Sequence, residues 1–467
     1  MKMNRRQFNT LAGLSTAGLV VPGLTTAKAQ AQASTNMFEG SKNMFTAAPP
    51  EHGKNWHPLA AKRPHNDILS RIQGLMKRDG FEALILVTPE NILYSTGYFS
   101  KFAYAPGVPA GAQTAAVIPA KGKAQLIVSL YEKDDAPRQT IDVEYTSVAG
   151  FVFVDDGTAE SHQERSAVLD PALTIKSAVK IAQDLAPKGK IGMETGMLLA
   201  GFRDYISSQI NDKRIADCSS LMFESRLIKF PWEVDMLRLA AQHAERFMAR
   251  AARELQPGMN AMVFDKLIQI AAWEEDKENS MSTPGYQTGV GPYWGIGLAP
   301  RNYVIKEGDV CRIDGGGVHL GYISDISRTW VVGGSEGKPG EKYVETYDAL
   351  YAGFAKGLEM LGPGVKFKDL YAAIRKEVEK SSVIPKYPRG HMGHGISVAP
   401  TAEDIPKISA TEETVFQPGM CISMECSYMA AQGAPAPGPY NIEDSFVITE
   451  DGYERFTMAP DSIIWNV

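Results

Sequence analysis

The chain has 467 residues, more than one ordinary hydrophobic core supports, so we expect two domains with additional segments. Hydrophobic residues make up 44% of the chain and charged residues 22%, proportions that are typical of a soluble globular protein. The formal net charge of −6 leaves no basic field for nucleic acid or for an anionic membrane, so neither is expected as a partner.

The start of the sequence has the pattern of a targeting segment. Arg5 and Arg6 precede a mildly apolar run over residues 11–24, and Ala27-Lys28-Ala29 supplies the small residues that a signal peptidase reads. Residues 1–29 are therefore interpreted as a twin-arginine export signal, with a tail or an uncleaved anchor as the alternative reading. No later stretch reaches the ~18 apolar residues of a membrane span, so we expect a periplasmic mature protein without a membrane segment.

An α/β domain is expected after a linker. Residues 30–64 are rich in Ala, Ser, Pro and Asn and lack a periodic pattern, which indicates the linker. From residue 65 to 224, apolar runs alternate with amphipathic segments, which predicts strands and helices in turn. Strands are expected over 84–87, 115–118 and 126–128, and a helix over 68–77. Titratable residues are not clustered here, so this domain is expected to shape a pocket or an oligomer interface.

A second domain, over residues 225–467, contains an internal repeat. A long helix is predicted to begin at Pro231 and to end at a Leu-x-Pro-Gly turn, residues 255–258. The same turn recurs at residues 361–364, again between two predicted helices that are followed by strands. The repeated order of elements indicates a duplication, with two halves related by a pseudo-twofold axis.

Four acidic residues occupy matching places in the two halves. Asp325 follows Asp314 after 11 residues in the first half, and Glu443 follows Glu425 after 18 residues in the second. Each of these residues lies in or beside a predicted strand. Four carboxylates facing one another in a protein interior would repel and take up protons unless cations lay between them. The pattern therefore predicts a metal centre.

A histidine is the fifth candidate ligand. His394 lies between Gly393 and Gly395, and residues without a side chain let the backbone approach a site closely. Carboxylates together with one imidazole form a donor set that suits Mn, Fe(II), Co or Zn and does not select among them.

At this point the sequence resembles metallopeptidase family M24, in its creatinase and Xaa-Pro aminopeptidase branch. The resemblance covers residues 65–460 and is carried, in order, by Asn91-Ile92-Leu93-Tyr94-Ser95-Thr96-Gly97-Tyr98, Asp314-Gly315-Gly316-Gly317, Gly321 to Thr329, Gly393-His394-Gly395-Ile396, Pro418-Gly419-Met420 and Ile442-Glu443-Asp444. It implies a creatinase-type α/β domain followed by a catalytic domain of the pita-bread fold. It also implies a homodimer.

The resemblance further implies two divalent metal ions and a hydrolytic activity. Asp314 would chelate one ion, and His394 would bind the other together with Glu425. Asp325 and Glu443 would bridge the two ions. The implied reaction is hydrolysis of a C–N bond, of an amide or Xaa-Pro-like kind, in a dipeptide or another small molecule.

Two histidines that usually accompany these ligands are absent. The position 17 residues before Asp314 holds Gly297, and the position seven residues after His394 holds Thr401. Loss of general acid or base help of this kind typically reduces a rate by ~10²–10⁴-fold. The dimethylsulfoniopropionate lyases of M24 resemble this chain in lacking both histidines, so a metal-dependent lyase is the alternative function. A non-catalytic binding protein is a third.

Other residues are candidates for a substitute base and for the substrate pocket. His391, three residues before His394, and Tyr387 are the candidates for the base, although a histidine at this place is often a hydrogen-bonding neighbour of the ligands. Aromatic residues that could line the pocket, or could simply pack, are Tyr293, Trp294 and Tyr303. His319 is expected to be exposed in a hairpin turn.

Overall fold

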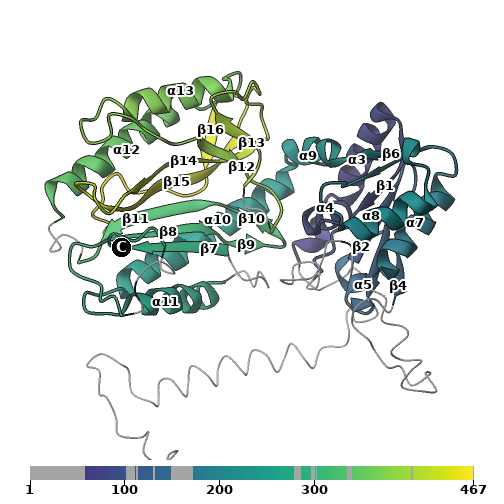
Figure 1. Ribbon diagram of the computed structural model, residues 1–467, viewed down its shortest axis with the longest axis horizontal. Helices are drawn as coiled ribbons and strands as arrows, with labels where there is room; N and C mark the ends of the chain where they lie inside the picture. Colours follow the sequence, from purple (N-terminus) through teal and green to yellow (C-terminus); the bar gives the residue numbers. More distant parts are fainter. Residues whose placement is uncertain are drawn as a thin grey trace, which may run out of the picture. The chain divides into compact units, whose positions relative to one another are not determined.

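The computed structural model describes residues 58–100, 111, 114–129, 132–148, 172–277, 285–295, 300, 302–333, 339–400 and 403–465 (Figure 1). The expected export signal, most of the expected linker, Gly297 and Thr401 lie outside the described residues. The expected boundary between residues 224 and 225 falls inside helix α9, and the chain passes from α9 to α10 over residues 228–230.

The first domain is built on a six-stranded sheet with the strand order β4-β3-β2-β1-β5-β6. Its strands are β1 (Phe81–Leu86), β2 (Thr114–Pro119), β3 (Gln125–Ser129), β4 (Glu144–Val148), β5 (Lys190–Met193) and β6 (Ile215–Asp217). Its helices are α3 (His65–Asp79), α4 (Pro89–Thr96), α5 (Ala136–Gln139), α7 (Leu173–Leu185), α8 (Ala200–Gln209) and α9 (Ser219–Leu227), with short 3₁₀ turns η1 (Ala60–Lys62) and η3 (Asp212–Arg214). β1 runs parallel to β5 and antiparallel to β2, so the sheet is mixed.

Both faces of strand β1 are buried, which explains its continuous apolar run. Side chains alternate between the faces of a strand. Leu84 and Leu86 belong to the apolar cluster that includes helix α3, whereas Ala83 and Ile85 belong to the cluster that includes α7. The α/β domain expected from the sequence is confirmed.

The second domain combines four helices with an eight-stranded sheet. The helices are α10 (Pro231–Glu254), α11 (Ala261–Glu274), α12 (Glu341–Met360) and α13 (Phe367–Val378). The strands are β7 (Gly285–Val290), β8 (Val310–Gly316), β9 (Val318–His319), β10 (Tyr322–Ile323), β11 (Ile326–Val331), β12 (His391–Gly395), β13 (Asp404–Ser409), β14 (Cys421–Ala430), β15 (Gly438–Ile448) and β16 (Tyr453–Arg455). β9 and β10 form a separate hairpin.

The order of the strands displays the pseudo-twofold relation of the two halves. The order is β13-β12-β14-β15-β11-β8-β7, with β16 also paired to β15. The central pair β15 and β11 joins the halves, and β14 then β12 on one side correspond to β8 then β7 on the other. The repeated turns have matching geometry, since φ is +89° at Gly258 and +88° at Gly364. The duplication predicted from the sequence is confirmed.

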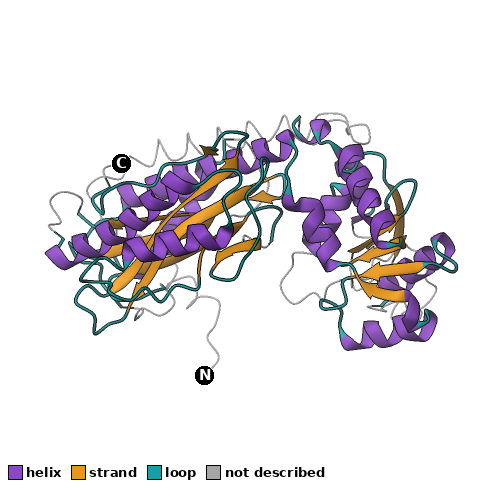
Figure 2. Cartoon of the chain, turned by 90° about the horizontal axis from the view of Figure 1, so that it is seen from above, coloured by secondary structure: helices purple, strands orange, loops and turns teal. Residues whose placement is uncertain are grey.

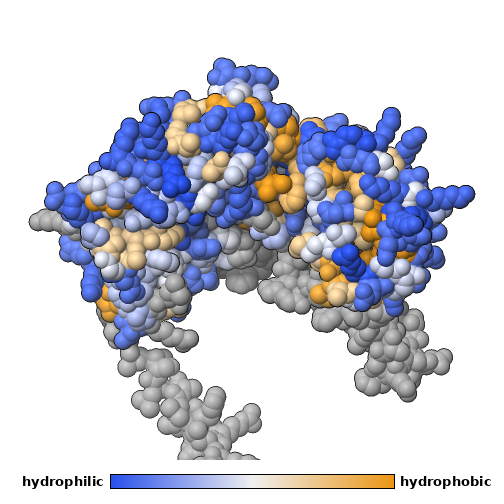
Figure 3. All heavy atoms as spheres, turned by 45° about the horizontal axis from the view of Figure 1, so that its top comes forward, coloured by the Kyte–Doolittle hydropathy of each residue, from blue (hydrophilic) through white to orange (hydrophobic). Residues whose placement is uncertain are grey.

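Each half of the sheet is covered by its own pair of helices. Apolar side chains of α10 and α11 form one core with β7, β8 and β11, and those of α12 and α13 form another with β12, β14 and β15. Figure 2 shows these helices running alongside the strands. On the face drawn in Figure 3, hydrophilic side chains dominate and apolar ones gather in scattered patches. None of the described helices combines the length and the apolarity that crossing a membrane requires.

Candidate metal centre

The alternation of side chains places the acidic residues on the face of the sheet that the helices leave free. On β8, Cys311 and Ile313 belong to the core beneath α10 and α11, so Asp314 faces the opposite side. On β14, Met424 belongs to the core beneath α12 and α13, so Glu425 also faces the opposite side. The same pleat therefore separates packing residues from candidate ligands in both halves.

The strand register brings these residues side by side. Glu425 lies directly opposite Glu443 in the β14–β15 pair. Ser327 of β11 lies opposite both Asp314 and Glu443, and Asp325 is found just before β11 begins. The joint between the two halves is thus the place where the carboxylates meet.

A cavity of about 570 Å³ opens at this place. Its lining includes all five candidate ligands: Asp314, Asp325, His394, Glu425 and Glu443. It also includes charged residues that the sequence did not single out as functional: Arg312, Arg389 and Glu403.

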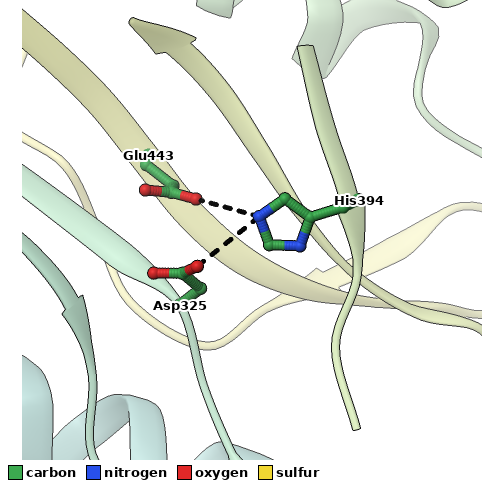
Figure 4. Close-up of side chains that lie close together, drawn as sticks. All are labelled: Asp325, His394 and Glu443. Carbon is green, nitrogen blue, oxygen red and sulfur yellow. Dashed lines mark ion pairs between the residues drawn. The ribbon is translucent and has the colours of Figure 1, made fainter. Parts of the chain in front are cut away.

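Three of the candidate ligands form one close, buried group (Figure 4). The Nε2 atom of His394 lies 3.5 Å from Oδ2 of Asp325 and 3.8 Å from Oε1 of Glu443. One donor atom from each residue lies within 4.8 Å of the others. Nδ1 of His394 donates to the Gly395 carbonyl at 3.0 Å, so Nε2 is the ring nitrogen that faces the carboxylates. Two carboxylates and one imidazole nitrogen fit a divalent transition-metal ion.

The electrostatics of the group favour a cation. Burial, followed by repulsion from Asp314 and Glu425, raises the pKa of Asp325 well above its ordinary value. Burial and repulsion from Asp325 raise the pKa of Glu443 in the same way. A cation between the two carboxylates would stabilise their charged forms and so counteract both shifts.

Asp314 and Glu425 line the cavity but are held by other side chains. Nη1 of Arg312 donates to Oδ2 of Asp314 at 2.9 Å. Nη2 of Arg389 donates to Oε1 of Glu425, and Nδ2 of Asn441 donates to Oε2 of Glu425 at 3.3 Å. These two carboxylates are therefore neighbours of the three-residue group and not members of it.

The two candidate bases have different surroundings. Nδ1 of His391 lies 3.3 Å from Oε1 of Glu425, and burial lowers the pKa of this imidazole. Tyr387 is fully buried, its hydroxyl donates to the Ser427 carbonyl at 2.9 Å, and burial raises its pKa well above the ordinary value. The lining of the cavity includes neither His391 nor Tyr387, so the expectation that one of them acts as a base stays a prediction.

The aromatic residues expected in the pocket lie elsewhere. Tyr293 and Trp294 line a separate hollow of about 250 Å³. The Tyr303 hydroxyl donates to Asp309 at 2.8 Å, and its ring packs edge-on against Tyr293. The aromatic side chain that lines the metal cavity is Tyr286.

The expectation that His319 is exposed is wrong. The residue is only 2% exposed, because strand β9 packs against helix α10. The hairpin between the two aspartates is thus part of the domain interior.

Among the cavity residues that the sequence did not single out, one could have been recognised from the sequence pattern. Arg312 stands two residues before Asp314 in an otherwise apolar strand, and a spacing of two places both side chains on one face. Arg389 and Glu403 lie just outside regular strands, where no periodicity indicates the direction of a side chain.

Comparison with known proteins gives a consistent result. Residues 235–450 match the model of metallopeptidase family M24, and residues 68–228 match that of the creatinase/prolidase N-terminal domain. The chain is 27% identical over 283 residues to the Xaa-Pro dipeptidase of Pyrococcus horikoshii, and this alignment covers 59% of this chain and 74% of that protein. It is 24% identical over 398 residues to the uncharacterized peptidase YqhT of Bacillus subtilis, which covers 85% and 99%. The solved structure of the Xaa-Pro dipeptidase from Bacillus anthracis shares the fold, with a TM-score of 0.67 at 20% identity over 85% of this chain and 98% of that one.

Proposed function

We propose, from the premise that this chain belongs to metallopeptidase family M24 and is a hydrolytic enzyme, that it cleaves a C–N bond of an amide or Xaa-Pro-like kind in a small substrate. The observation that carries the proposal is the buried group of Asp325, His394 and Glu443 in its cavity of about 570 Å³. Cavities of ~300–1,000 Å³ are the usual size for small ligands. The similarity to proteins named Xaa-Pro dipeptidase supports a dipeptide as the substrate.

The proposed cofactor is a divalent metal ion held by Asp325, His394 and Glu443. Such an ion, when bound, polarises a carbonyl oxygen and lowers the pKa of water, which is the chemistry that amide hydrolysis needs. The two-ion arrangement implied by the sequence requires Asp314 and Glu425 as well. Before these two carboxylates could bind an ion, the hydrogen bonds from Arg312 to Asp314 and from Arg389 to Glu425 would have to break.

Glu403 is the proposed proton carrier in this cavity. Its carboxylate lines the cavity and pairs with Lys407. Burial alone would raise the pKa of Glu403, but the hydrogen bond from Lys407 and the field of His394 lower it below the ordinary value. An ionised carboxylate beside the reacting bond can accept a proton, a role that Gly297 and Thr401 cannot fill.

A lyase is the second candidate, and the same residues favour it. The positions of both auxiliary histidines hold residues without a titratable group, which weakens the case for protonation of a leaving amine. In a lyase, a base such as Glu403 would remove the proton on the carbon next to a substrate carboxylate while the C–S bond on the following carbon breaks. A C=C bond forms, dimethyl sulfide leaves, and no water attacks.

The experiment separates these reactions by their products. Purified protein is loaded separately with Mn, Fe(II), Co or Zn and incubated with Xaa-Pro dipeptides, simple amides and dimethylsulfoniopropionate. Release of free amine, abolished in Asp325→Asn, supports the hydrolase, whereas release of volatile sulfide supports the lyase. Absence of both products with every metal would contradict the proposal.

The role of Glu403 is tested in the same assay. Glu403→Gln is expected to lose ~10²–10⁴-fold in kcat with its metal content unchanged. Glu413→Gln serves as the control, since Glu413 is likewise exposed and paired with lysines but lies outside the cavity. A Glu403→Gln enzyme with normal kcat would remove Glu403 from the reaction.

A further inference from the structure

We infer that this metal centre holds one divalent ion and that the guanidinium groups of Arg312 and Arg389 occupy the place of a second cation. Like the proposed function, it rests on one ion bound by Asp325, His394 and Glu443. It concerns the number of ions and not the reaction, so either can fail without the other.

The first observation is that only three of the five candidate ligands come together. Across the described residues, one group of donor atoms is close enough to share an ion, and it contains Asp325, His394 and Glu443. Asp314 and Glu425 line the same cavity but contribute no oxygen to that group. The geometry thus supplies a complete site for one ion only.

The second observation is that both oxygens of Glu425 already accept hydrogen bonds. Oε1 accepts from Nη2 of Arg389, and Oε2 accepts from Nδ2 of Asn441. Glu425 is 4% exposed, so these two side-chain donors supply most of its polar contacts. Asn441 also donates to Oε2 of Glu443 at 3.1 Å, which links this carboxylate pair to the single-ion site.

The third observation concerns Asp314, the residue expected to chelate the second ion through both of its oxygens. Oδ2 of Asp314 is taken by Nη1 of Arg312. Arg312 is 3% exposed, and a guanidinium keeps its charge in proteins. Breaking the contact would leave a buried charge without its partner, which is strongly unfavourable.

Each half of the domain supplies one arginine to its carboxylate. Asp314 on β8 and Glu425 on β14 occupy corresponding strands of the two halves. Each of these carboxylates has an arginine of its own, Arg312 in the first half and Arg389 in the second. In the two-ion arrangement, the ion at Asp314 would therefore meet the guanidinium of Arg312, and the ligand Glu425 would still be paired with Arg389.

The charges balance with one ion. The four carboxylates that line the cavity as candidate ligands, Asp314, Asp325, Glu425 and Glu443, carry four negative charges. The charge of Glu403, which also lines the cavity, is matched by its ion pair with Lys407. Arg312 and Arg389 supply two positive charges, and one divalent ion supplies the remaining two. A second divalent ion would leave an excess of two positive charges in a largely buried site, where uncompensated charge is costly.

The test counts the ions in the full-length protein without any substrate. Protein stripped with a chelator is titrated with Mn²⁺, and bound metal is measured by mass spectrometry while electron paramagnetic resonance reports the spin coupling. We expect one ion per chain and the six-line spectrum of an isolated Mn²⁺. Two ions per chain, or the spectrum of a coupled pair, would overturn the inference, even if the protein hydrolysed dipeptides.

The role of the guanidinium groups is tested by removing their charge. Arg312→Met combined with Arg389→Met is expected to raise the count from one ion to two, because Asp314 and Glu425 become free to bind. Arg375→Met is the control, since Arg375 pairs with Glu379 outside the cavity. A folded double variant that still binds one ion would overturn the role of the arginines. If the double variant fails to fold, the ion count of the unmodified chain decides.

Discussion

Asp325 is the residue on which the metal centre depends most directly. Its side chain faces His394, and its backbone carbonyl accepts hydrogen bonds from the hydroxyls of Ser423 and Ser445 at 2.9 and 2.8 Å. These bonds fix the short segment between β10 and β11 to the neighbouring half of the sheet. The carboxylate is thereby held in place before any ion binds.

Replacing this carboxylate by an amide is expected to empty the site. In Asp325→Asn the side chain is nearly the same size, but a neutral amide oxygen is a weaker ligand, so metal affinity should fall by at least ~10–100-fold and turnover with it. Metal content and activity are measured together. Asp451→Asn, in an exposed turn, is the control. An Asp325→Asn protein with normal metal content and turnover would show that the ligand assignment is wrong.

The raised pKa values of Asp325 and Glu443 make the effect of the metal depend on pH. In the metal-free protein both folded pKa values lie above the ordinary unfolded values near 4, so the stability these groups contribute is complete below about pH 4 and is lost as pH rises through the folded values. Bound metal should offset this loss at neutral pH. The rise in Tm on adding Mn²⁺ should therefore be larger at pH 7.5 than at pH 5. Equal shifts at both pH values would contradict the coupling.

At the scale of elements, strand β12 has little freedom beside His394. Gly393, next to His394, has φ of +128°, and a Cβ atom there would lie 2.0 Å from the Ser423 carbonyl oxygen of β14. Only glycine allows the two strands to pair at this distance. The position of the imidazole thus depends on a residue that has no side chain.

An added methyl group should displace this strand. Gly393→Ala is expected to lose about 1–3 kcal/mol of folding free energy, together with most of its metal affinity, because the strand must shift and His394 shifts with it. Gly390→Ala, where nothing lies within 4 Å of the added atom, should change neither quantity. Thermal unfolding and metal titration provide the two measurements. Equal behaviour of the two variants would refute this account of β12.

Elements whose residues repeat with a regular period were predictable from the sequence. The strand run at residues 84–87 and the helix over residues 68–77 correspond to β1 and α3. The repeated turns at residues 255–258 and 361–364 disclosed the two halves of the sheet. In each case the signal is local, because burial of one face or both sets the pattern.

What the sequence did not reveal depends on contacts between distant segments. Arg389 and Glu425 are 36 residues apart, and no local pattern indicates that they meet. The expectation for Tyr293 and Trp294 failed because a loop aromatic has no periodicity that fixes its direction. The five candidate ligands could be named in advance, but their division into a group of three and a pair held by arginines needed the geometry.

At the scale of the whole molecule, the substitution of both auxiliary histidines should limit the rate. Gly297 and Thr401 cannot protonate a leaving amine, so turnover of Ala-Pro and Gly-Pro should fall below the ordinary enzyme range of ~1–10³ s⁻¹. Steady-state assays with Mn²⁺ or Co²⁺ measure it. Turnover inside that range would mean that other groups fully replace the histidines.

The central pairing of β11 with β15 has a consequence for folding during synthesis. Ser327 pairs with Glu443, 116 residues further along the chain, so the two halves of the site cannot meet until β15 has left the ribosome. Pairings over such sequence distances form late and slowly, because closing the long loop costs conformational entropy before the new contacts contribute favourable free energy. Metal capture is therefore an event of the finished polypeptide. A nascent chain that stops before Gly438 lacks Glu443 and therefore cannot form the three-residue group with Asp325 and His394.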